Sequence, residues 1–77
     1  MKLWRLETIE DRGIWNIHVG FVIRAADEAE ARRIAEKEAE EEWQRAPGYW
    51  LDASRSSCEA VAVDGEPAVI LADFNAG

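Results

Sequence analysis

One segment of this chain has the character of a helix, and the segments on both sides of it alternate as strands do. Residues 27–45 are rich in Ala, Glu and Arg, and a stripe of small side chains recurs every fourth residue. Asp27 is a natural N-cap with Glu30 as its capping-box partner, and Pro47-Gly48 is expected to end the helix. Because a lone helix covers only one face of a sheet, this pattern favours a two-layer architecture.

Four segments have the apolar alternation of β-strands, namely residues 2–10, 14–24, 58–63 and 68–74. The clearest is the second, in which apolar side chains occupy every odd position from Trp15 to Ile23. Turn signals at 10–13 and 64–67 separate the strands within each pair. We therefore predict a single α+β domain over residues 1–77, with ββαββ order, an antiparallel sheet and one helix on one face.

The sheet face that the helix leaves open is expected to carry apolar side chains. Some of Leu3, Ile9, Ile14 and Val22 belong to it, although alternation does not decide which face the helix takes. An exposed apolar face favours self-association, and symmetric oligomers are its usual outcome. We therefore expect a homo-oligomer that meets through sheet surface.

The charge balance limits the partners of the chain. Sixteen Asp and Glu stand against nine Lys and Arg, which gives a net charge of −7. An acidic surface repels a phosphate backbone, so general nucleic-acid binding is disfavoured. The single cysteine, Cys58, fits a reducing cytoplasm, and no apolar run approaches the roughly 20 residues of a membrane span. We expect a cytoplasmic protein without membrane contact.

Residues for catalysis or metal binding are sparse. His18 and Cys58 are the single residues of their types and lie on different predicted strands, which argues against a Cys–His pair. The sequence has no CxxC, no paired histidines and no glycine-rich phosphate loop. We expect neither enzyme activity nor a metal or cofactor.

The loop at residues 49–57 is the preferred ligand region. Tyr49 and Trp50 could stack on a base, while Arg55 and its neighbouring serines could donate hydrogen bonds to a phosphate. The alternative is a structural loop with Trp50 beneath the sheet. The predicted ligand-binding residues are Trp50, Arg55, Ser57, Phe74, Asn75, Arg24 and His18.

The acidic run Glu36–Glu42 permits two interpretations. Like charges four residues apart destabilise a helix slightly, and acids near its C-terminus oppose the helix dipole. The run is either a solvated face that maintains solubility or a surface for a basic partner, with Glu38, Glu41 and Glu42 as contacts.

The C-terminal residues Val69-Ile70-Leu71-Ala72-Asp73-Phe74-Asn75-Ala76-Gly77 resemble the ending of many small, uncharacterised bacteriophage accessory proteins, usually Ala-Ser-Phe-Asn-Ala-Gly. The opening Met1-Lys2-Leu3-Trp4 and the strand–helix junction at 22–32 are similar to theirs, so the resemblance covers about half the chain. Asp73 stands where serine is more usual, so no role of that hydroxyl carries over.

This resemblance implies an accessory protein that acts in the cytoplasm of the host bacterial cell, where such proteins frequently blunt host defence. We expect a nucleotide sponge, which is a homo-oligomer that binds and sequesters a nucleotide immune signal without cleaving it. The alternative is an acidic protein–protein inhibitor, a nucleic-acid mimic of the anti-CRISPR kind, that binds a host defence protein through the Glu36–Glu42 helix surface. A third possibility is a structural or regulatory phage accessory.

Overall fold

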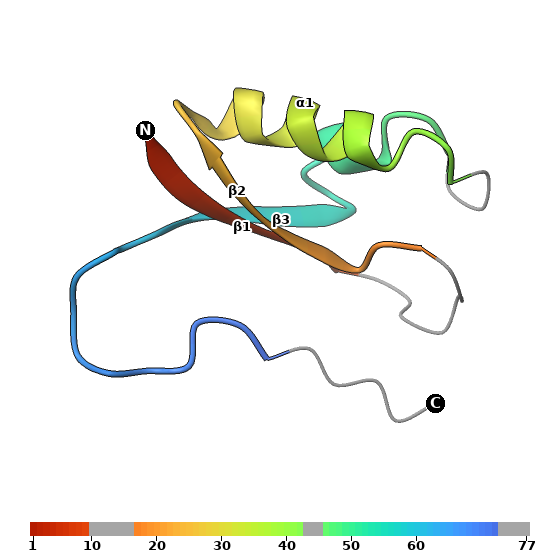
Figure 1. Ribbon diagram of the computed structural model, residues 1–77. Helices are drawn as coiled ribbons and strands as arrows, with labels where there is room; N and C mark the ends of the chain where they lie inside the picture. Colours follow the sequence, from red (N-terminus) through yellow and green to blue (C-terminus); the bar gives the residue numbers. More distant parts are fainter. Residues whose placement is uncertain (10–16, 43–45, 73–77) are drawn as a thin grey trace.

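The computed structural model describes residues 1–9, 17–42 and 46–72. The elements in chain order are β1 (Lys2–Thr8), β2 (Gly20–Ala25), α1 (Glu28–Glu38), the short 3-10 helix η1 (Tyr49–Leu51) and β3 (Ser56–Val61). The strands form one antiparallel sheet in the order β2-β1-β3, and α1 lies across one face of it (Figure 1). The predicted α+β class, with an antiparallel sheet and one helix, is confirmed.

The register decides which side chains face the helix. Leu6 on β1 lies opposite Phe21 on β2 and Cys58 on β3. Since side chains alternate along a strand, these residues share a face. This covered face consists of Lys2, Trp4, Leu6, Thr8, Phe21, Ile23, Ala25, Ser56, Cys58 and Ala60. The opposite, uncovered face consists of Leu3, Arg5, Glu7, Val22, Arg24, Ser57, Glu59 and Val61.

The helix begins as the sequence predicts. The Asp27 carboxylate accepts a hydrogen bond of 2.8 Å from the Glu30 N–H, and the Glu30 carboxylate accepts one of 2.7 Å from the Ala26 N–H. Ala31 and Ala35 are fully buried against the covered face. Their small side chains allow the helix to lie close to the strands, as the alanine stripe predicts.

The predicted end of the helix is wrong. The helix stops at Glu38 with Ala39 as its C-cap, well short of Arg45 and Pro47-Gly48. Repulsion among the glutamates and the helix dipole both weaken a longer helix. Glu36 and Glu42 also have partners elsewhere: Glu36 accepts from Gly48 and Trp50 N–H groups, and Glu42 binds His18.

Two predicted strands also differ from the structure. The predicted strand 14–24 is observed from Gly20 onward, residues 17–19 are not strand, and 14–16 lie outside the described residues. Within the predicted strand 68–74, residues 68–72 form no strand and 73–74 lie outside the described part. Because residues 68–72 have no ladder partner, the described fold is ββαβ rather than ββαββ. We call residues 62–72 the C-terminal arm.

Candidate functional site

The aromatic residues of the predicted ligand loop belong to the hydrophobic core. Trp50 is 1% exposed, and its ring packs edge-on against Phe21 at 4.8 Å and Tyr49 at 5.5 Å between centroids. A ring buried in this way offers no face for stacking on a ligand. The interpretation of 49–57 as a structural loop therefore fits the structure, and the ligand role predicted for Trp50 does not.

Arg32 connects α1 to the core side of this loop. Arg32 is 7% exposed. Its guanidinium donates to the Trp50 carbonyl at 3.1 Å and to the Ser56 hydroxyl and carbonyl at 2.9 and 3.1 Å. Nε pairs with Glu28 at 2.8 Å, as four-residue spacing predicts. The burial itself was missed, because nothing in the sequence distinguishes Arg32 from the exposed Arg33 next to it.

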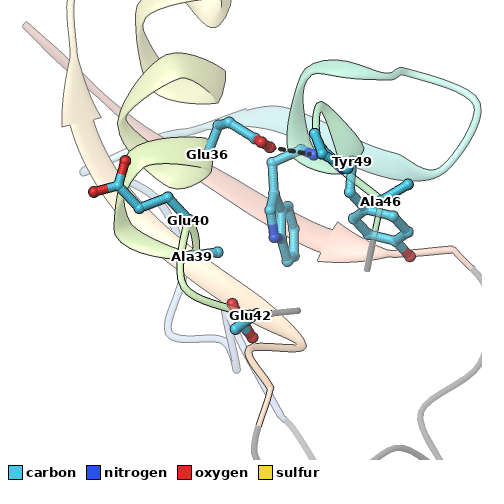
Figure 2. Close-up of a pocket in the computed structure, with 8 residues that line it drawn as sticks. Glu36, Ala39, Glu40, Glu42, Ala46 and Tyr49 are labelled. Atoms are coloured by element: carbon cyan, nitrogen blue, oxygen red, sulfur yellow. Dashed lines mark hydrogen bonds between the residues drawn. The ribbon is translucent and has the colours of Figure 1, made fainter. Parts of the chain in front are cut away.

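A cleft of about 330 Å³ lies between the C-terminal end of α1 and η1 (Figure 2). Glu36 points across it and accepts hydrogen bonds of 2.8 Å from Gly48 N–H and 3.1 Å from Trp50 N–H. Glu40 and Glu42 add two further carboxylates to the lining. The cleft lining is Glu36, Ala39, Glu40, Glu42, Ala46, Pro47, Tyr49 and Trp50. Its charge suits a basic group and repels a phosphate.

His18 belongs to this acidic end of the molecule. The Glu42 carboxylate accepts from the His18 backbone N–H and lies 3.0 Å from Nδ1, and the imidazole stacks on Phe21 with centroids 4.7 Å apart. An anionic ligand at His18 would meet the Glu42 carboxylate, so this position disfavours the predicted anion contact. Glu42 is thus hydrogen-bonded to His18 within the fold, whereas Glu38 and Glu41 are exposed.

A basic, apolar groove lies at the end of the sheet where β1 begins and β3 ends, and residues of both faces line it. Its volume is about 500 Å³, and its lining is Met1, Lys2, Leu3, Arg24, Ala60, Val61, Ala62 and Val63. Lys2 and Arg24 contribute two positive charges, and none of the described residues that line the groove is acidic. Arg24 is there because the register places it opposite Leu3, which in turn lies opposite Val61. Arg24 is one of the predicted ligand contacts and Lys2 is not, because the place of Lys2 in the groove depends on how β1 and β3 pair.

The other predicted contacts do not gather at this groove. Ser57 lies opposite Glu7, four residues or about 13 Å along β1 from the position of Leu3, and its hydroxyl is 3.4 Å from the Glu7 carbonyl. Arg55 is exposed and pairs with Asp52 at 3.6 Å. Phe74 and Asn75 lie outside the described residues.

Two ionisable groups have shifted pKa values with clear causes. Hydrogen bonds from the Ser54 hydroxyl and backbone N–H lower the pKa of Asp52, and nearby Arg55 adds to the effect. Burial raises the pKa of the Cys58 thiol. The thiol therefore stays protonated at neutral pH, which is the opposite of an activated nucleophile.

In residues 1–9, 17–42 and 46–72, no three His, Cys, Asp or Glu side chains gather in a way that could hold a metal ion. None of the helices in this described part has the length and apolar character required to cross a membrane. No protein-family model, curated protein or solved structure matches the chain.

Proposed function

We propose that this chain is a phage-encoded counter-defence protein of the host cytoplasm that binds and sequesters a nucleotide immune signal as a homo-oligomer. The observation that carries the proposal is the groove at Lys2 and Arg24, which combines two cations with apolar walls in a molecule of net charge −7. A local positive site of this kind selects a compact anion while the remaining surface repels long nucleic acids. The proposed ligand contacts are therefore Lys2 and Arg24, in place of the residues of the 49–57 loop.

The chemistry of the groove matches the two parts of a nucleotide. The Arg24 guanidinium presents a planar fork of donors that can bind a phosphate through two hydrogen bonds, and Lys2 adds a second charge. Leu3, Val61 and Val63 supply apolar surface for a base or sugar. A volume of about 500 Å³ falls within the usual range for small-molecule sites.

Binding without cleavage is supported by where the reactive side chains lie. Cys58 packs against the core and lies opposite Leu6, three residues or about 10 Å along β1 from Leu3 in the groove. His18 pairs with Glu42 near the other end of β2. Neither residue lines the groove, so the signal would be held intact.

Native mass spectrometry of the full chain with a panel of cyclic and linear nucleotides tests the proposal. We expect one member of the panel to be retained through gel filtration and released intact on denaturation. Arg24→Ala should weaken binding roughly tenfold or more, since a charge-assisted contact to phosphate is lost. Arg33→Ala, which removes the same charge from the exposed side of α1, is the matched control. Retention of no nucleotide, or equal binding by both variants, would refute the proposal.

The acidic cleft supports a second candidate function, inhibition of a basic host defence protein. Glu36, Glu40 and Glu42 converge there at the helix end whose carbonyl groups are also electronegative. The double variant Glu38→Lys and Glu41→Lys reverses two exposed charges beside the cleft without touching Glu42. It should abolish capture of a basic nuclease, while Glu66→Lys on the arm should not. Equal capture by both variants would exclude this function.

A further inference from the structure

Large apolar side chains are exposed on the side of the sheet away from α1. Met1, Val22, Val63, Val69, Ile70 and Leu71 are 41–88% exposed. Val22 belongs to the uncovered face, Met1 and Val63 line the groove, and the other three lie on the C-terminal arm, which runs beneath the sheet (Figure 1). One chain therefore carries an open sheet face with an exposed valine, an apolar groove at the end of the sheet and an open apolar segment.

The arm touches this face without covering it. Arg5 donates a hydrogen bond from Nη1 to the Ile70 carbonyl, so the arm already has a specific polar contact with the centre of the uncovered face. Ile70 and Leu71 nevertheless remain 46% and 41% exposed. The arm therefore makes a specific polar contact with the uncovered face of its own molecule but buries little apolar surface against it.

The uncovered face is also the electrically balanced part of an acidic protein. Residues 27–42 hold eight acidic side chains against three basic ones, so the helix side repels a second copy. The uncovered face holds two arginines and two glutamates, and Arg5 pairs with Glu7 at 3.3 Å and Glu59 at 3.0 Å. Two copies can therefore approach through this face without net repulsion.

We propose that two copies pair through their uncovered faces and exchange C-terminal arms. Each arm then lies over Arg5 and Val22 of the other copy, where Arg5 donates to the Ile70 carbonyl of the exchanged arm, and the groove at Leu3 and Val61 stays open. An exchanged segment repeats a contact that the single chain already makes, which is why exchange is a low-cost route to dimers. Residues 64–67 are the hinge, where Gly65 has a φ of +151° and Pro67 stiffens the chain. The inference rests on the homo-oligomer of the proposed function but needs no ligand.

Light scattering after gel filtration, on the full chain without nucleotide, is the first test. We expect a concentration-dependent dimer that the double variant Ile70→Asp and Leu71→Asp weakens roughly tenfold or more, because unpaired carboxylates are costly to bury. Ile34→Asp makes the same kind of change on the exposed side of α1 and should leave the dimer intact. Circular dichroism verifies that each variant folds. A wild-type protein that stays monomeric, or an unaffected double variant, would overturn the proposal.

Cysteine cross-linking separates exchange from simple face pairing. In a Cys58→Ala background, each chain carries both Val22→Cys and Leu71→Cys. Exchange predicts disulfides that join two chains, whereas an arm that stays on its own sheet gives disulfides within one chain, and a majority of the latter contradicts exchange. Nucleotide binding by the same preparations distinguishes the two proposals. A dimer that binds nucleotide but forms no interchain disulfides excludes only the exchange, and a cross-linked dimer that binds none excludes only the proposed function.

Discussion

The two faces of the sheet are made by the same three strands and yet have different roles. The covered face concentrates Leu6, Ile23 and Ala25 in a buried core beneath α1, to which Trp50 also belongs. The uncovered face has Arg5 at its centre, bonded to two glutamates, with apolar side chains toward one end. Alternation therefore gives both faces some apolar residues, and the helix decides which of them becomes the core.

Leucine truncation on β1 is the sharpest way to test this contrast. Leu6→Ala on the covered face should lower the free energy of unfolding by about 2–5 kcal/mol, since Leu6 is 0% exposed and leaves a cavity. Leu3→Ala on the uncovered face should cost less than about 1 kcal/mol. Urea unfolding of dilute protein measures both, and similar losses would mean that the faces are not distinct.

Replacement of Arg32 removes buried hydrogen bonds on the covered side of the sheet. Arg32→Met should lower the free energy of unfolding by about 3 kcal/mol, because the Trp50 carbonyl and the Ser56 groups would lose their buried donor. Arg33→Met, at an exposed position, should stay within about 0.5 kcal/mol of wild type. Thermal and urea unfolding provide the comparison, and a stable Arg32→Met variant would show that Arg32 does not hold the loop.

The start of the helix that distinguishes the covered face can be weakened separately. Asp27→Ala should destabilise the protein by about 1 kcal/mol, because the Glu30 N–H loses its acceptor. Asp27→Asn keeps a capping oxygen and should recover most of that loss. Equal unfolding midpoints for Asp27→Ala and wild type would contradict the observed cap.

The raised pKa of Cys58 provides a test of how well the covered face is shielded from solvent. Burial favours the neutral thiol and so stabilises the folded state. This stabilisation is fully present below the pKa of the thiol in the unfolded chain, and it is lost as the pH rises through the raised pKa of the folded protein. Iodoacetamide reacts with the thiolate, so at pH 8 the folded protein should be alkylated more slowly than the protein in urea. Equal rates, followed by intact mass, would mean that the thiol is not shielded.

The elements set by local chemistry could be predicted from the sequence, and those that depend on distant partners could not. Asp27 with Glu30 marks the helix start, and alternation locates β1, because neighbouring residues suffice for both. The early helix end, the burial of Arg32 and the place of Lys2 in the groove all depend on residues 12 to 60 positions away. For the same reason Arg24 was found as a candidate while the rest of its site was not.

The central position of β1 has a consequence for how the protein is made. β1 leaves the ribosome before either of the two strands that flank it in the sheet, and the second of these, β3, ends only at Val61. Until β3 has been synthesised, β1 must therefore wait with one hydrogen-bonding edge open. Crowded polysomes, where many nascent copies show that same edge, are the setting in which this fold is most vulnerable to mispairing.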